Sequence, residues 1–186
     1  GMLTGPLRDR FQMREHLDFY SDEELTQIIK GNAKKLQLEI DDESANIIAI
    51  RSRSTPRIAN NRLRCVRDYV TARADGNIDP DITRAALLKW EIDTLGLDKM
   101  DRKYLETLID VFGGGPAGVE AIAHTINTAS DTLVDEVEPF LLRTAMVVRT
   151  PRGRIATQRA FDHMGMAGEP VDIDVESARD DQDTLF

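Results

Sequence analysis

The residues of this chain best suited to binding chemistry are arginines that gather in two windows free of acidic residues. The window from Arg51 to Arg67 holds six arginines, and the window from Arg143 to Arg159 holds five. Guanidinium groups donate paired hydrogen bonds to phosphate oxygens, so each window is a candidate anion-binding surface. An ordinary solvated basic surface is the alternative for both.

The second window concentrates its charge on a predicted turn. Arg149, Arg152 and Arg154 fall within six residues, and no acidic residue screens them. Gly153 permits a tight turn and Pro151 stiffens it. A rigid loop with converging guanidinium groups favours contact with the phosphates of DNA.

In the first window, Arg57 directly follows Pro56 at the predicted start of a helix. Free N–H groups and the positive end of the helix dipole suit an anion there, such as a nucleotide phosphate. From the residues alone, a plain basic helix face is the favoured interpretation.

No catalytic or metal-binding constellation is found in the sequence. His16, His124 and His163 are isolated from one another, which favours surface or packing roles. Gly113 to Gly115 indicates a helix end and not a phosphate loop, because no strand precedes it and no Gly-Lys-Ser/Thr follows. Cys65 is the single cysteine, which excludes an internal disulfide and favours an inert small residue.

Composition constrains the class of protein. The net charge is −9, but residues 163–186 alone hold seven acidic residues and one basic residue, so the total does not exclude nucleic acid. Hydrophobic residues make up 41% and aromatic residues 5%, which predicts aliphatic cores. No apolar run suits a membrane span and no signal peptide is recognised, so we expect a cytoplasmic protein.

Capping signals and apolar spacing predict a mainly α chain that begins with a small four-helix domain. Ser21 and Glu24 form a capping box, and Pro56 and Pro80 each stand at a first helical position after a capping residue. The predicted helices span residues 22–36, 56–74 and 80–90, and a further one starts at residue 41 or 42 with Ala45, Ile48 and Ala49 on one face.

The following segment has the element order of a winged helix, which is three helices and then a β-hairpin. Ser130 is predicted to cap the third helix, and Pro139 to kink it. Inward positions on the three helices are Met100, Tyr104, Leu105, Leu108, Ile109 and Phe112; Val119, Ile122, Ala123 and Ile126; and Leu133, Val137, Phe140 and Leu141. The predicted strands span residues 145–149 and 154–158.

These patterns predict that the chain consists of four parts. Residues 1–20 are the end of a larger domain, with a single weak alternation that suits one strand. Residues 21–95 form the four-helix domain, and residues 96–165 the winged helix. Residues 166–186 form an acidic disordered tail.

The predicted helix before the hairpin indicates how DNA would be held. Its predicted exposed residues are Asp131, Thr132, Asp135, Glu136 and Glu138. Base reading in the major groove usually uses Arg, Lys, Asn or Gln, and phosphates repel an acidic helix. DNA contact is therefore predicted to come from the hairpin, through the backbone and with little sequence preference.

Four linked motifs resemble the RuvB family, the hexameric AAA+ motors of Holliday junction branch migration, over about residues 3–165. The motifs are Leu7-Arg8-Asp9-Arg10-Phe11, Thr55-Pro56-Arg57-Ile58-Ala59-Asn60, Met100-Asp101-Arg102-Lys103 and Arg149-Thr150-Pro151-Arg152-Gly153-Arg154. The resemblance implies an AAA+ lid domain followed by a winged-helix DNA-binding domain, preceded by a remnant of the large ATPase domain.

The resemblance also implies roles for individual residues. Arg10 matches the arginine finger that acts on the nucleotide of a neighbouring subunit. Tyr20 matches a nucleotide-contacting position at the lid junction, and Arg57 matches the lid arginine that senses the phosphates in its own subunit. Arg149 and Arg154 match wing arginines that hold DNA.

The activity implied is that of an ATP-dependent DNA helicase that works as a homo-hexamer in recombination and repair. ATP is the implied cofactor, and Mg²⁺ and the partner RuvA would be bound by the large domain that this sequence lacks. The chain by itself is therefore expected to hold no cofactor and to be inactive as an ATPase.

Three departures from the family pattern bear on these roles. Gln12 and Ser54 stand where relatives have glycine, and Ser130 stands where many have a basic residue, which leaves more of the DNA contact to the wing. Two alternatives stay open: a sequence-specific winged-helix regulator of transcription, and another AAA+ machine such as a clamp loader.

Overall fold

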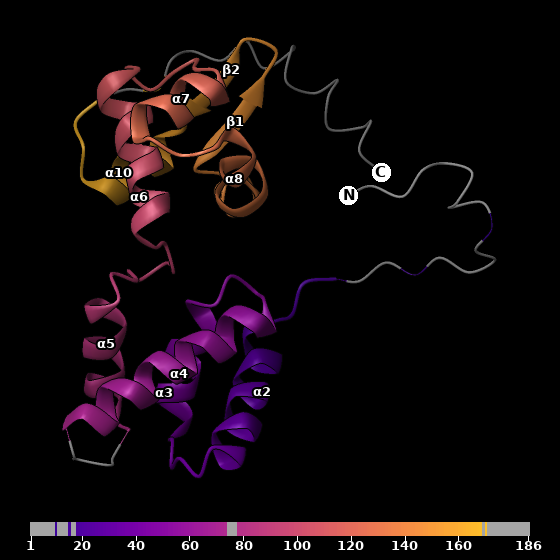
Figure 1. The fold of residues 1–186 in the computed structure, drawn as a ribbon, viewed down its shortest axis with the longest axis vertical. Helices are drawn as coiled ribbons and strands as arrows, with labels where there is room; N and C mark the ends of the chain where they lie inside the picture. Colours follow the sequence, from indigo (N-terminus) through magenta and orange to yellow (C-terminus); the bar gives the residue numbers. More distant parts are fainter. Residues whose placement is uncertain (1–9, 11–14, 16–17, 74–77, 169, 171–186) are drawn as a thin grey trace. The chain divides into compact units, whose positions relative to one another are not determined.

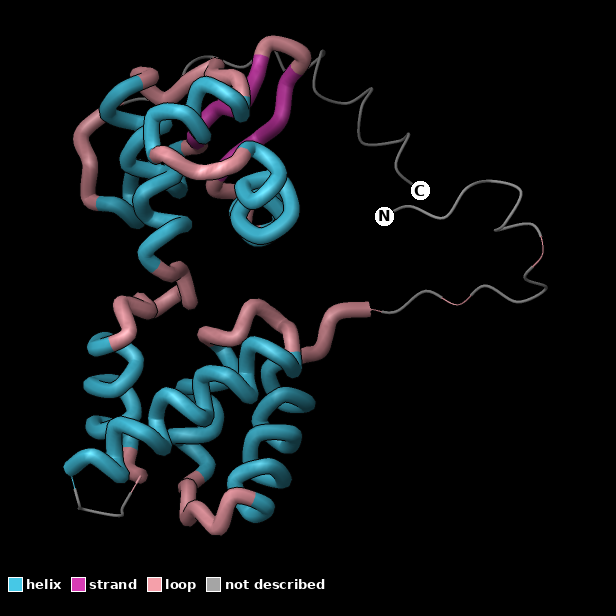
Figure 2. The backbone as a smooth tube through the Cα atoms, viewed as in Figure 1, coloured by secondary structure: helices cyan, strands magenta, loops and turns pink. Residues whose placement is uncertain are grey.

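The computed structural model describes residues 10, 15, 18–73, 78–168 and 170. This part of the chain is mainly helical, with one two-stranded antiparallel sheet, so the predicted fold class is confirmed (Figure 2). The chain divides into two compact units, the first ending at Thr83 and the second beginning at Arg84. The parts of the sequence predicted as a remnant of a larger domain and as an acidic tail lie largely outside the described residues.

The first unit is built from short helices that begin where the capping signals predict. Ser21 accepts a hydrogen bond from the Glu24 amide at 3.2 Å, and Glu24 Oε2 accepts one from the Ser21 amide at 2.9 Å, which completes the capping box. The helices of this region, of which the last runs across the division at Thr83, are α2 (Asp22–Lys35), α3 (Asp42–Ile50), α4 (Pro56–Arg73) and α5 (Pro80–Lys89).

The core of the first unit is aliphatic, as the low aromatic content predicts. Helix α2 buries Leu25, Ile29 and Ala33, which recur every four residues along one face. Among the described residues up to Thr83, all the buried apolar side chains are Leu, Ile, Val or Ala.

The second unit contains the predicted three helical segments and hairpin (Figure 1), and the hairpin packs against η1, α9 and α10. Two of the helical segments change to π-helical turns, labelled η. The elements are α6 (Lys99–Glu106), η1 (Thr107–Val111), α7 (Val119–Ile126), α8 (Ser130–Thr132), η2 (Leu133–Val137), α9 (Glu138–Arg143), β1 (Val147–Thr150), β2 (Gly153–Ala156) and α10 (Gln158–Met164).

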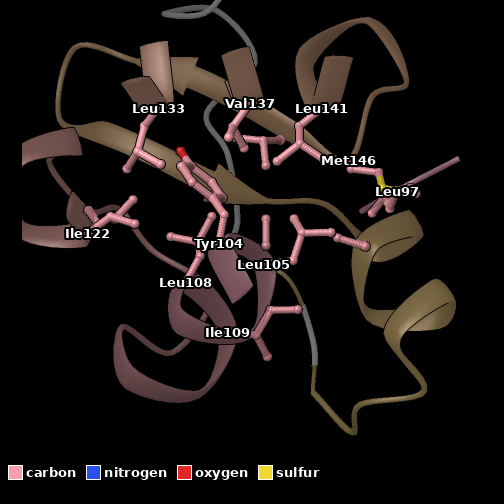
Figure 3. Packing of buried hydrophobic residues seen from close by; sticks show 14 of the residues in the cluster. Leu97, Tyr104, Leu105, Leu108, Ile109, Ile122, Leu133, Val137, Leu141 and Met146 are labelled. Carbon is pink, nitrogen blue, oxygen red and sulfur yellow. The ribbon is translucent and has the colours of Figure 1, made fainter. Parts of the chain in front are cut away.

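The core of this unit joins all three helical segments to the hairpin. Figure 3 shows the Tyr104 ring among Leu108, Leu133 and Val137, with its hydroxyl oxygen on the Leu133 side. Tyr104 is fully buried, so its hydroxyl needs a partner inside the protein.

The structure bears on two local expectations for the third helix. Ser130 is the first helical residue and Ala129 occupies the cap position without a side-chain hydrogen bond, so the predicted serine cap is wrong by one residue. The π-helical turn η2 ends two residues before Pro139, and the kink predicted at this proline stays a prediction. Proline has no N–H to donate to the preceding turn, so it stands where α9 begins and not in the interior of a helix.

Helix α10 is absent from the sequence-based prediction, which assigned Gln158 to a strand. Thr157 has the extended backbone of a helix cap, and the chain leaves the sheet there. Gly165 then ends α10 in the left-handed conformation, with Ala160 and Phe161 buried. A glycine after this short apolar pattern is the signal that could have indicated the helix.

The glycine-rich segment after η1 does more than end a helix, because it pairs with β2. Ala117 N donates to Arg154 O at 3.0 Å, and Arg154 N donates to Ala117 O at 2.8 Å. A Cβ on Gly153 would lie 2.5 Å from Ala117 O, and one on Gly115 would lie 2.2 Å from Arg154 O. Glycine at these two positions allows the backbones to approach and so fixes the hairpin on the helical core.

The variant Gly153→Ala is expected to destabilise the second unit by about 2–3 kcal/mol, since its φ of +137° and the clash with Ala117 both oppose a side chain. Gly118→Ala is the matched control, because nothing lies within 4 Å of its Cβ and its φ is −69°. Hydrogen exchange of the β1–β2 amides measures the difference, and equal protection in the two variants would contradict the expectation.

Candidate nucleic-acid interface

The hairpin β1–β2, which we call the wing, brings the three predicted DNA-binding arginines together. Arg149 lies directly opposite Arg154, and Thr150 lies opposite Gly153. Directly opposed residues of an antiparallel pair point to the same face, so both guanidinium groups leave the wing on one side. Arg152 stands in the two-residue connection and is exposed.

A buried carboxylate, Glu138, lies beneath Arg149 and Arg154. Arg149 donates to Glu138 Oε2 from Nε at 3.0 Å and also from Nη2. Arg154 donates from Nε to Oε1 at 2.8 Å and from Nη2 to Oε2 at 3.2 Å. Tyr104 Oη donates to Oε1 at 3.0 Å. We call these four residues the Glu138 cluster.

The prediction that Glu138 is exposed is therefore wrong, since its side chain has no solvent-accessible surface. Glu138 begins α9, and its position one turn before Leu141 places it on the buried face of that helix. Two guanidinium groups and a phenol offset the cost of removing the carboxylate from water. Sequence periodicity alone carries no sign of this, because the partners lie 11, 16 and 34 residues away.

The cluster sets the protonation of its own members. Burial raises the pKa of Glu138, but the hydrogen bonds and charges of Arg154 and Arg149 outweigh burial and hold the pKa below its usual value. Burial, together with the Glu138 charge and hydrogen bond, raises the pKa of Tyr104. Glu138 is therefore ionised at neutral pH, and Tyr104 is a protonated donor.

The wing keeps positive charge after this pairing. One carboxylate faces two guanidinium groups, and each arginine uses only its Nε and Nη2 atoms on Glu138. The Arg149 side chain is 45% exposed and that of Arg154 is 19% exposed. Within the described residues, Arg152 makes no hydrogen bond or ion pair. The surface that results can donate to phosphate oxygens.

The helical segment that precedes the wing is acidic on its exposed side, as predicted. Asp131, Asp135 and Glu136 are exposed, and Thr132 is half-buried. These carboxylates would repel phosphates, and they lack the donors that read guanine or adenine in the major groove. The chemistry of this unit favours contact through the wing.

The residues predicted to contact nucleotide lie in the first part of the chain. Arg57 is the second residue of α4 and is exposed, as are Arg10 and Tyr20. No hydrogen bond or ion pair joins these three within the described residues. In the adjoining turn, Ser54 takes the left-handed conformation with φ of 53°, which glycine adopts at less cost than serine.

A groove of about 240 Å³ in the first unit is lined by other residues than those predicted to meet nucleotide. Asn32 donates to Asn60 Oδ1 at 2.7 Å across it, which ties α2 to α4. The lining residues are Asn32, Lys35, Leu36, Asn60, Leu63 and Arg64.

The remaining residues with reactive or metal-binding side chains lie in surroundings that suit structural roles. Among the described residues, no group of three His, Cys, Asp or Glu could hold a metal ion. His163 Nε2 lies 2.8 Å from Asp93 Oδ2, and His16 lies outside the described residues. Burial raises the pKa of the Cys65 thiol, which disfavours the reactive thiolate.

None of the helices in the described ranges is long and apolar enough to span a bilayer.

Two family models together match residues 20–165. Residues 20–93 match the RuvB AAA lid domain, and residues 94–165 match the RuvB C-terminal winged helix domain.

Curated relatives include the Holliday junction branch migration complex subunit RuvB of Rhodopirellula baltica, 62% identical over 88% of this chain and 45% of that protein. The protein of the same name from Mycobacterium avium is 51% identical over 89% of this chain and 47% of its own length. The chain spans about half the length of the curated relatives it matches.

The chain is also similar to solved structures of RuvB proteins. The RuvB Holliday junction branch migration motor of Thermotoga maritima is 43% identical, with a TM-score of 0.83, over 89% of this chain and 55% of that chain.

Proposed function

Because the chain belongs to the RuvB family, we propose that it is the C-terminal part of an ATP-dependent DNA helicase that drives Holliday junction branch migration. Such a motor would serve recombination and repair, and work on DNA agrees with the cytoplasmic location expected from the sequence. The matched half of the relatives, an AAA lid followed by a winged helix, supports this assignment.

The observation that carries the DNA part of the proposal is the wing. Arg149, Arg152 and Arg154 lie on one short hairpin, whereas the exposed carboxylates Asp131, Asp135 and Glu136 lie on the preceding helical segment. The wing holds the phosphate backbone and does not read bases. A motor that moves along DNA must tolerate every sequence, and phosphates are the same on all of them.

The lid contributes to nucleotide sensing. The exposed Arg57 in the first turn of α4 fits a nucleotide phosphate, because a guanidinium group and the free N–H groups of a helix start meet there. Tyr20 contacts the same nucleotide, and Arg10 reaches the nucleotide of a neighbouring subunit. ATP supplies the phosphoryl group. Mg²⁺ and RuvA are bound outside this chain, and a homo-hexamer supplies the neighbour.

Salt-dependent DNA binding tests the wing. Arg149→Ala and Arg152→Ala are each expected to weaken binding by a similar factor on every sequence and to flatten the dependence of log affinity on log salt by about one unit. Fluorescence anisotropy with short duplexes of unrelated sequence measures both quantities.

Arg159→Ala is the matched control, because it removes the same charge from α10 at an exposed position off the wing. Its salt dependence should stay close to that of the parent chain. A loss that depends on the DNA sequence would contradict backbone contact and favour base reading.

A further inference from the structure

We infer that Glu138 is a positioning residue for DNA contact: it holds Arg149 and Arg154 by one side of each guanidinium group and presents the opposite edge of Arg149, next to Arg152, to a phosphate. The geometry of the cluster is independent of the proposed function, whereas the identity of the ligand rests on it.

The hydrogen bonds to Glu138 occupy its carboxylate completely. Oε1 accepts from Tyr104 Oη and Arg154 Nε, and Oε2 accepts from Arg149 Nε, Arg149 Nη2 and Arg154 Nη2. A carboxylate offers about four lone-pair sites, so no acceptor capacity is left for a further donor. Each arginine is thus held through two nitrogens, which fixes the plane of the guanidinium group as well as its position.

The fixed orientation leaves N–H donors on the opposite side of each guanidinium group available for a further hydrogen bond. Of about five N–H donors on a guanidinium group, the two on Nη1 and the second on Nη2 point away from Glu138. Within the described residues, Nη1 of Arg149 and of Arg154 has no hydrogen-bond partner. The exposed fractions of 45% and 19% make Arg149 the outward contact and Arg154 chiefly the inner support.

Preorganisation gives this arrangement its functional value. An arginine on a free hairpin loses side-chain freedom when it binds a phosphate, and that loss weakens binding. Water cannot compete for Glu138, which is fully buried, so the arginines are ordered before DNA arrives. The cross-strand register then sets the spacing between the two guanidinium groups.

Simple electrostatics, in contrast, predicts that Glu138 weakens DNA binding. A negative charge beside the wing lowers its positive potential, so a residue that acts only by neutralisation would weaken DNA binding. Removing that charge would then strengthen binding. The sign of the change upon charge removal therefore separates the two roles.

The test compares Glu138→Gln with Glu136→Gln in the full chain. Both variants remove one negative charge from neighbouring turns, but Glu136 is exposed and makes no hydrogen bond or ion pair within the described residues. We expect Glu138→Gln to bind a short fluorescent duplex about tenfold more weakly, the loss of one charge-assisted contact. Glu136→Gln should bind equally or slightly more tightly. Equal or tighter binding by Glu138→Gln would overturn the inference.

A second measurement on the parent chain needs no variant and guards against a folding defect in Glu138→Gln. The ¹⁵N-resolved Nε–H signals of Arg149 and Arg154 are expected to exchange slowly with water, with Arg152 as the rapidly exchanging control. Exchange as fast as that of Arg152 would refute the positioning role even if DNA binds. Slow exchange without any DNA binding by the parent chain would instead contradict the proposed function and leave the cluster geometry intact.

Discussion

Replacing Glu138 with alanine is expected to lower the free energy of unfolding of the winged-helix unit by about 3 kcal/mol. Removing one partner of a buried ion pair typically costs about 3–5 kcal/mol, because the opposite charge stays buried and unpaired. The lower end of this range applies because the Arg149 side chain, which is 45% exposed, can reorient into solvent. Arg154 and Tyr104 are too buried to do so. Chemical denaturation followed by circular dichroism measures the difference.

The effect of Glu138→Ala should depend on pH in one direction. The folded-state pKa of Glu138 lies below its ordinary value of 4.5, so its stabilisation is fully present above that value. It is lost as pH falls through the folded-state pKa, and the gap between parent and variant should narrow there. Glu136→Ala, exposed on the same segment, is expected to be near neutral at every pH. A constant gap in acid would mean that packing, and not charge, explains the loss.

In a full-length protein that joins this chain to the proposed ATPase domain, Arg10→Ala is expected to lower the rate of ATP hydrolysis by about 10³-fold or more. An arginine finger meets the charge that develops on the transferring phosphoryl group, and it contributes about 10³–10⁵ to kcat. Nucleotide binding should be largely spared, because the role proposed for Arg10 places it across a subunit boundary from the nucleotide. Steady-state hydrolysis and nucleotide affinity, measured on the same preparation, separate the two effects.

Glu15→Ala serves as the control for Arg10→Ala, because Glu15 is also exposed and lies in the same segment. Mixing Arg10→Ala subunits with subunits defective in the phosphate loop should restore part of the activity, since one mixed interface is again complete. Hydrolysis at the parent rate by Arg10→Ala alone would show that the role has been assigned to the wrong residue.

The helices could be predicted because their start signals are local. Ser21 with Glu24, Pro56 and Pro80 each act within one helical turn, so the first unit follows from short-range chemistry. Helix α10 was missed because it is short and directly follows a strand, although Gly165 marks its end.

The surroundings of the candidate site could be predicted only in part. The positions of Arg149, Arg152 and Arg154 on one hairpin followed from the turn residues between them. The burial of Glu138 could not, because an acidic residue in an acidic helix gives no local sign of partners that arrive through tertiary packing with Tyr104 and the hairpin. The roles of the predicted site residues stay predictions.

Recovery of DNA from a random-sequence pool tests most directly the claim that this chain holds DNA through the wing without reading bases. The chain is immobilised, the pool is applied at low salt, and the retained DNA is quantified and sequenced. The parent chain should retain DNA that rising salt releases, the Arg149→Ala/Arg152→Ala double variant should retain far less, and the retained sequences should share no motif. A common motif in the retained DNA, or equal retention by the double variant, would contradict the account.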